Sequence, residues 1–118
     1  MMSEIKLPWD SRTVRVAVVG DLILDEYLDG VVNRISPEAP VPVHLVRSTS
    51  VTAGGAANVA RNIQLAGGQA LMIGVCGADA AGNQLKDILA TDGVDIRGIL
   101  VDNDRPTIKK TRITAKSS

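Results

Sequence analysis

The strongest constraint on the fold is a proline-rich stretch near the start of the chain, "RISPEAPVPV". It places Pro37, Pro40 and Pro42 within six residues. Because proline lacks a backbone N–H and its ring clashes with the preceding helical turn, this stretch favours turns or a sheet edge and excludes a helix. The flanking segments 28–35 and 43–47 can both form strands. We therefore predict a β excursion that leaves the main sheet.

Outside this excursion, strand-like and helix-like segments alternate. The runs "TVRVAVVGD" (13–21) and "ALMIGVCG" (70–77) predict buried strands, the first opening into a loop at its end. Helical spacing after Gly55 predicts a helix that buries Val59 and ends at Gly67 and Gly68.

A second helix is predicted in "DAAGNQLKDILATDG", with Asp79 as its N-cap, Gly93 at its end, and a buried face of Leu85, Ile88 and Leu89. Two short strands follow, near 97–102 and 108–115. The order β, β excursion, α, β, α, β, β indicates an α/β domain with a small accessory sheet.

Composition excludes several classes of function. Thirteen basic and thirteen acidic residues cancel, so no strong field favours nucleic acid or an anionic membrane. With one Trp, one Tyr and no Phe, the chain lacks a platform for stacking single-stranded bases. No segment approaches the ~18 apolar residues of a membrane span, and the first residues lack the apolar run of a signal peptide. The single Cys76 fits a reducing compartment and a buried position. We expect a cytoplasmic protein.

The first candidate binding segment is "AGGAANVARN" (53–62). Gly54 and Gly55 would let backbone N–H groups approach a ligand at a helix start, and Asn58 can both donate to and accept from hydroxyl groups. A tight connection that needs small residues is an equally good interpretation. The spacing fits neither the dinucleotide fingerprint nor the phosphate loop, which excludes a dinucleotide-binding domain.

Charged residues supply two further candidates. Asp21 and Asp25 follow the first predicted strand, where open α/β sheets bind ligands; we favour a turn-capping role for Asp21 and a sugar-binding role for Asp25. In "IKKTRIT" (108–114), strand alternation places Lys110 and Arg112 on one face and Lys109 on the other.

The pair Lys110 and Arg112 could hold a substrate phosphate, although such charges more often form a solvated strand edge. Arg34 in "NRISPEAP" is a similar candidate. His44 has neither an acidic partner nor a nucleophile pattern nearby, so we assign it no catalytic role. No metal-ligand spacing occurs, and we expect no metal site within the chain.

Together these residues resemble the first signature of the ribokinase-like (PfkB) carbohydrate kinases, which "AGGAANVA" (53–60) matches, with Gly67 and Gly77 further on. "VVGDLILD" is similar to the family's opening strand and sugar-binding Asp. Within the family, "GDLILDEY", "NRISPEAPVPV" and "GGAANVARNI" are most similar to the kinases that act on D-glycero-β-D-manno-heptose 7-phosphate. The resemblance covers almost the whole chain from residue 13.

The resemblance implies that residues 1–118 are the N-terminal, sugar-side portion of a three-layer α/β/α sandwich. It also implies a small β-sheet lid, formed by segments about 28–47 and 97–115, that closes over the sugar and makes a homodimer interface in many relatives. The sugar-binding positions fall on Asp25, Gly54, Gly55 and Asn58. The implied reaction transfers the γ-phosphoryl group of ATP, with Mg²⁺, to the anomeric hydroxyl of the heptose 7-phosphate, for ADP-heptose and lipopolysaccharide core synthesis.

The family's second signature, D-T-x-G-A-G-D, does not occur in the 118 residues. That signature supplies the base Asp and the anion hole for phosphoryl transfer, and the ATP-binding half is missing as well. We therefore expect no catalytic residue here and no phosphoryl transfer by this chain alone. The alternatives are another sugar or nucleoside kinase of the family and, for the isolated chain, a non-catalytic binding or dimerisation module.

Overall fold

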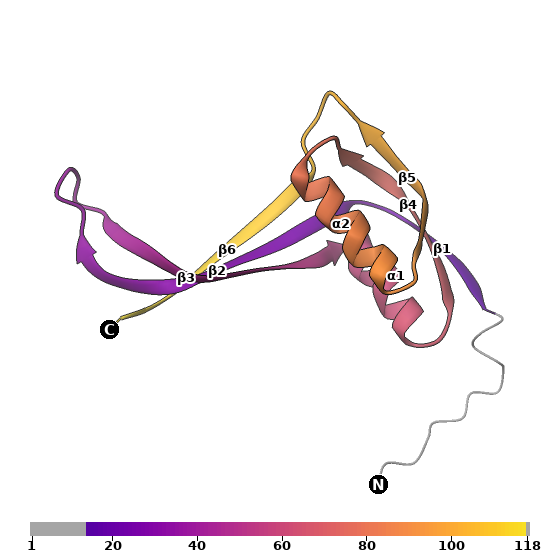
Figure 1. Cartoon of the computed structure of the whole chain (residues 1–118), viewed down its shortest axis with the longest axis horizontal. Helices are drawn as coiled ribbons and strands as arrows, with labels where there is room; N and C mark the ends of the chain where they lie inside the picture. The colour runs from indigo at the N-terminus through magenta and orange to yellow at the C-terminus, as the bar shows by residue number, and fades with distance from the viewer. Residues whose placement is uncertain (1–13, 118) are drawn as a thin grey trace, which may run out of the picture.

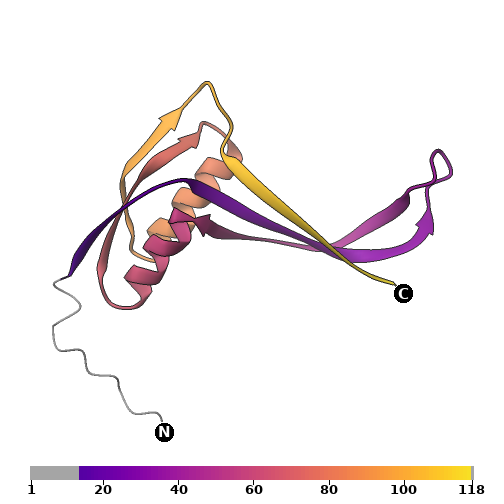
Figure 2. The same cartoon turned by 180° about the vertical axis from the view of Figure 1, so that it is seen from behind.

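The computed structural model describes residues 14–117. In chain order its elements are β1 (Arg15–Val19), β2 (Leu22–Ile35), β3 (Pro42–Gly55), α1 (Ala56–Leu65), β4 (Gln69–Gly77), α2 (Ala80–Thr91), β5 (Asp95–Asp102) and β6 (Ile108–Ser117). They form two three-stranded sheets, one in the body of the protein and one that projects away from it (Figures 1 and 2).

The body sheet has the order β1-β4-β5 with all strands parallel. Its strands are connected through α1 and α2, which pack on one face of the sheet and against each other. Both helices end as the sequence predicts, because Gly67 and Gly93 adopt positive φ values of 100° and 88°. Asp79 caps α2 by accepting a hydrogen bond from the Gly82 N–H at 2.8 Å.

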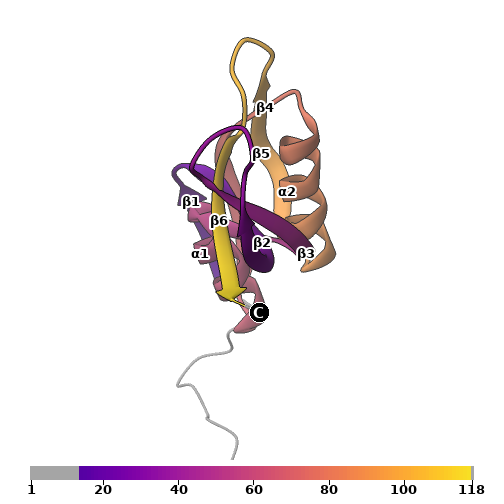
Figure 3. The ribbon, with the colours of Figure 1, turned by 90° about the vertical axis from the view of Figure 1, so that its left-hand side faces the viewer.

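The projecting sheet has the order β3-β2-β6, and we call it the lid sheet. β2 and β3 form a long antiparallel hairpin, and β6 pairs parallel to β2. Pro37 and Pro40 lie in the hairpin tip, and Pro42 is the first residue of β3, so no proline interrupts a paired segment. Figure 3 looks onto the end of the lid sheet, whose strands lie in front of the body.

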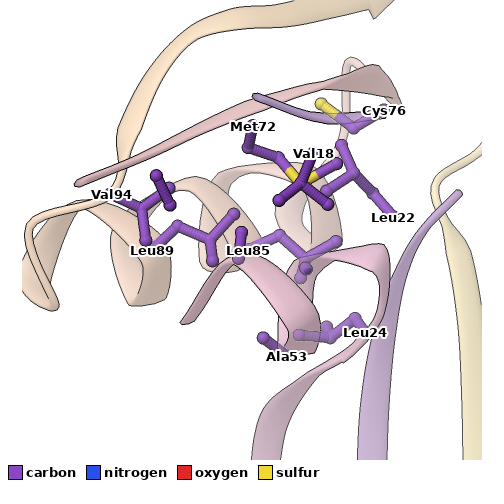
Figure 4. Packing of buried hydrophobic residues seen from close by; sticks show 12 residues of the cluster. Val18, Leu22, Leu24, Ala53, Met72, Cys76, Leu85, Leu89 and Val94 are labelled. Atoms are coloured by element: carbon purple, nitrogen blue, oxygen red, sulfur yellow. The ribbon is translucent and has the colours of Figure 1, made fainter. Parts of the chain in front are cut away.

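A common hydrophobic core joins the base of the lid sheet to the body (Figure 4). Leu22 and Leu24 of β2 are 1% and 0% exposed and pack with Met72 of β4 and with Leu85 and Leu89 of α2. Cys76 is also buried in this cluster, as expected. Because burying each large apolar side chain stabilises the fold by about 1.5–3 kcal/mol, this cluster fixes the base of the lid relative to the body.

Three predictions about local structure were wrong. The strand predicted over 28–35 begins earlier, at Leu22, because Leu22 and Leu24 alternate with outward-facing residues and are buried. The predicted lid segment 97–115 is divided: β5 lies in the body sheet beside β4, and only β6 joins the lid sheet. A β-α-β connection through α2 brings β5 there. Val59 is 50% exposed, since the smaller Ala57 and Ala60 face the core.

Candidate substrate site

The geometry around Asp25 identifies the candidate site. Asp25 lies on β2 and Gly54 on the neighbouring β3, and the Asp25 carboxylate occupies the space that a side chain at position 54 would need. A Cβ atom on Gly54 would lie 2.5 Å from Asp25 Oδ2 and 2.8 Å from its Cγ. Within residues 14–117, no group donates a hydrogen bond to this half-buried carboxylate. Both oxygens are therefore free to accept hydrogen bonds from a ligand.

Gly55 forms the junction between the lid sheet and α1. Its φ of 59° and ψ of −136° are strained for residues other than glycine, and a Cβ there would lie 2.6 Å from the Asp21 carbonyl oxygen. The Ala56 N–H donates to the same oxygen at 2.9 Å, so Asp21 shapes the turn through its backbone. Both glycines thus have a structural reason that agrees with the tight-connection interpretation: Gly55 permits the turn, and Gly54 leaves space for the Asp25 carboxylate.

Asn58 lies in the first turn of α1, one turn beyond Gly55, and is exposed. No side chain caps the N-terminus of α1. In the described part of the chain, Asn58 has no hydrogen-bond partner, so its amide can both donate and accept. An amide and a carboxylate are side chains that suit a ligand with several hydroxyl groups.

The register of β6 brings two cations to the Asp25 side of the lid sheet. Lys110 lies directly opposite Asp25, and Arg112 directly opposite Tyr27. We call this side the Asp25 face. Lys109 lies on the other side, where its ammonium group is 3.8 Å from Glu26, so the predicted alternation is observed. Among the described residues, Lys110 and Arg112 form no ion pair.

The structure does not bring Arg34 to the other candidates. Arg34 pairs with Val43 at the far end of the hairpin, and at about 3.3 Å per residue it is roughly 30 Å along β2 from Asp25. His44 holds the same region of the lid sheet together, because its Nε2 lies 3.0 Å from the Thr114 carbonyl oxygen of β6. It has a structural contact there and no partner suited to catalysis among the described residues.

Sequence reasoning missed residues that share the Asp25 face. Tyr27 is the next outward residue on β2, and Thr52 lies opposite Asp25 on β3. Their period-two spacing from Asp25 was the available signal, but the strand was predicted to begin only at residue 28, so the spacing was not applied to Asp25. The open side of the lid sheet therefore carries a carboxylate, a phenol, hydroxyl groups and two cations.

A hollow in the body of the protein lies elsewhere. It measures about 700 Å³ and is lined by Arg15, Gln69, Asp95 and Arg97 at the beginnings of the body strands. Open α/β sheets bind ligands at the opposite ends of their strands, where β1 and β4 lead into Gly20 and Gly77. This hollow is therefore not the candidate site.

Two further features of the described residues are relevant to function. No group of three or more His, Cys, Asp or Glu residues is arranged to hold a metal ion. None of the described helices has the length and apolar character needed to cross a membrane.

A parallel α/β body, a β lid that continues from its first strand, and an acceptor held at a Gly-Gly helix start together define the architecture of a ribokinase-like sugar kinase. The chain belongs to the pfkB family of carbohydrate kinases, whose family profile matches residues 14–117. The predicted family and fold class are thereby confirmed.

Proteins named "Bifunctional protein HldE" are similar in sequence. The HldE of Azorhizobium caulinodans is 46% identical over 105 residues, covering 88% of this chain and 22% of that protein. The HldE of Desulfatibacillum aliphaticivorans is 50% identical over 99 residues, covering 84% and 20%. The chain thus spans about a fifth of the length of these relatives.

Solved sugar kinases are similar in structure. Ribokinase from Cryptococcus neoformans, solved with ADP, gives a TM-score of 0.66 at 26% identity, with 87% of this chain and 31% of that chain covered. Fructokinase from Xylella fastidiosa, solved with ATP, gives 0.65 at 26% identity, with 84% and 29% covered. The body and the lid sheet together are therefore a recurrent arrangement among sugar kinases.

Proposed function

We propose that residues 1–118 form the N-terminal, sugar-binding portion of an ATP-dependent kinase that phosphorylates the anomeric hydroxyl of D-glycero-β-D-manno-heptose 7-phosphate in the cytoplasm. The observation that carries the proposal is the Asp25 carboxylate, seated against Gly54 without a protein donor. The similarity to HldE proteins supports the choice of substrate over ribose, fructose or a nucleoside.

In the proposed binding mode, one group of residues binds the sugar hydroxyls and another group binds the phosphate. Asp25 accepts hydrogen bonds from neighbouring sugar hydroxyls, while Asn58 and the backbone beside Gly54 and Gly55 hold the others. A phosphate on the far end of the sugar would extend along the Asp25 face toward Lys110 and Arg112. Arginine binds phosphate oxygens in pairs, so Arg112 would also orient this group.

The described residues do not offer a complete site for ATP and Mg²⁺. They contain neither a phosphate loop nor a cluster of acidic ligands for the metal. The proposal therefore assigns this chain the sugar side of the reaction, namely binding, orientation and, through the lid sheet, exclusion of water. We further propose that the chain by itself does not transfer the phosphoryl group.

Calorimetric titration of the chain with heptose 7-phosphate tests the proposal. We expect saturable binding that Asp25→Asn weakens at least about tenfold, because Asn replaces a charged acceptor by one with a single acceptor oxygen. Glu26→Gln is the matched control: it changes the adjacent carboxylate, which lies on the opposite face beside Lys109. Equal losses in both variants, or stabilisation by ribose or adenosine without binding of the heptose phosphate, would contradict the proposal.

The phosphate contact is tested separately. Lys110→Met and Arg112→Met should weaken heptose 7-phosphate and leave binding of the unphosphorylated heptose unchanged. Lys109→Met is the control, since Lys109 is on the other face. If all three variants bind heptose 7-phosphate with the same affinity, Lys110 and Arg112 do not contact the phosphate and form only a solvated strand edge.

We also propose that the lid sheet joins two copies of the chain. Its outer part exposes large apolar side chains, with exposed fractions of 60% for Ile35, 49% for Leu45 and 63% for Ile113. A second copy of the chain would cover these side chains. In such a dimer, Arg34 of one copy could approach the substrate phosphate bound by the other copy. Light scattering after size exclusion should give a dimer that Ile113→Ser weakens, whereas Val19→Ser, at an exposed body position, should not. A monomer at all concentrations would overturn the proposal.

A further inference from the structure

Four residues at the base of β6 form a closed hydrogen-bond network. The Thr107 hydroxyl donates to Asp79 Oδ1 at 2.6 Å, and the Thr107 N–H donates to Asp79 Oδ2 at 2.9 Å. The Gly77 N–H donates to the Thr107 hydroxyl oxygen at 2.9 Å, and Gly82 donates to Asp79 Oδ1 at 2.8 Å. Thr107 is buried, with only 6% of its surface exposed. The network thus ties the loop before β6 to the turn between β4 and α2.

Two glycines allow this close approach. A Cβ on Gly77 would lie 2.5 Å from the Arg105 carbonyl oxygen and 2.7 Å from the Thr107 nitrogen. A Cβ on Gly82 would lie 2.4 Å from the Gly77 carbonyl oxygen and 2.9 Å from the Thr107 hydroxyl oxygen. The loop before β6 therefore lies directly on backbone atoms, in a position that no larger residue at 77 would permit.

The network exceeds what is needed to cap α2. An N-cap requires one acceptor oxygen, and Asp79 Oδ1 provides it to Gly82. Asp79 nevertheless accepts two further hydrogen bonds from Thr107, one at each carboxylate oxygen. The Thr107 hydroxyl, followed by the N–H groups of Thr107 and Gly82, holds the pKa of the Asp79 carboxyl below its ordinary value of 3.8. The carboxylate is therefore ionised at neutral pH, and its hydrogen bonds are of the stronger, charge-assisted kind.

The position of Thr107 determines what the network can control. Thr107 directly precedes β6, whose pairing with β2 begins at Ile108 opposite Ile23. A shift of β6 by one residue would transfer Lys110 and Arg112 to the opposite face of the lid sheet, where Glu26 and Lys109 lie. Within residues 14–117 no strand pairs with the outer edge of β6, so its register depends on β2 and on its fixed base.

We propose that Asp79 and Thr107 are positioning residues that anchor the base of β6 and so keep Lys110 and Arg112 on the Asp25 face. The effect on ligand affinity rests on the function proposed above. The anchoring itself rests on the hydrogen bonds and can be measured without a ligand.

Hydrogen exchange followed by mass spectrometry provides the test on the 118-residue chain. Thr107→Val removes the hydroxyl at nearly constant volume, and we expect exchange across residues 108–116 to accelerate roughly tenfold, as for the loss of a hydrogen bond to a charged group. Exchange in α2 should stay unchanged, because Asp79 still caps Gly82. Thr107→Ser keeps the hydroxyl and should restore slow exchange.

A second variant distinguishes loss of the anchor from a general loss of stability. Asp79→Ser keeps an N-cap oxygen for α2 but removes the bonds to Thr107, so it should reproduce the effect of Thr107→Val on residues 108–116. Unchanged exchange in this segment for either variant, or an equal increase in α2 and β6, would overturn the anchor. In parallel, Thr107→Val should weaken heptose 7-phosphate binding about tenfold and Thr107→Ser should not. Failure of the unmutated chain to bind would refute the proposed function, while the exchange result would still decide the anchor.

Discussion

Replacing Gly54 by alanine should displace the Asp25 carboxylate and leave the rest of the fold in place. The three atoms nearest to a Cβ at position 54 all belong to Asp25, at 2.5, 2.8 and 3.1 Å. Contacts below 3.0 Å force a shift, and the short Asp25 side chain can move only by leaving its rotamer. Overpacking of this kind lowers the free energy of unfolding by about 1–3 kcal/mol. Alanine also reduces the conformational entropy of the unfolded chain, which raises the free energy of unfolding by about 0.4–1 kcal/mol. We expect Gly54→Ala to lower the free energy of unfolding by about 1–2 kcal/mol.

A double-mutant cycle with Asp25→Ala tests the cause. In the Asp25→Ala background the three atoms nearest to a Cβ at position 54 are gone, so Gly54→Ala should become neutral or stabilising by up to about 1 kcal/mol. Urea unfolding of the four proteins would give a coupling of about 2 kcal/mol from the difference. If the effects of Gly54→Ala and Asp25→Ala on the free energy of unfolding add within about 0.5 kcal/mol, the clash does not involve the Asp25 carboxylate and the explanation is wrong. The single variant should also weaken sugar binding, because the displaced carboxylate no longer lies where it can accept hydrogen bonds from the sugar hydroxyls.

Three further predictions follow from particular contacts. Gly55→Ala should cost roughly 2 kcal/mol or more in urea unfolding, also in the Asp25→Ala background, because its strain comes from a φ of 59° and a backbone oxygen at 2.6 Å. The pKa of Asp79 in the folded protein lies below its unfolded value of 3.8, so the ionised carboxylate stabilises the fold at any pH above 3.8. This stabilisation is lost as the pH falls through the folded-state pKa. Thr107→Val should therefore reduce the dependence of the thermal unfolding temperature on acidic pH. Hydrogen bonds from Arg97 lower the pKa of Asp95 to about 2, and an NMR titration of Arg97→Gln should return it toward 3.8, whereas an unchanged value would exclude this pair as the cause.

Local sequence signals predicted the elements whose causes are local. The ends of both helices were predicted because Gly67 and Gly93 can adopt positive φ, and the cap of α2 because Asp79 can bond to Gly82 within one turn. The proline run predicted the excursion because it excludes a helix, whatever it packs against. The resemblance carried by "VVGDLILD" and "AGGAANVA" placed Asp25, Gly54, Gly55 and Asn58 in one candidate site, and the structure joins Asp25 to Gly54 directly.

The sequence by itself therefore determined the order of the elements, the ends of the helices and the family. Only the tertiary structure decided that β5 joins the body sheet, that β6 joins the lid sheet, and that Lys110 comes to lie opposite Asp25. These outcomes depend on pairings such as that between Thr111 and Glu26, which are 85 residues apart, and no local pattern encodes their register. The register is instead fixed by contacts at the base of the lid sheet, where Leu22 and Leu24 are buried in the common core and Thr107 bonds to Asp79.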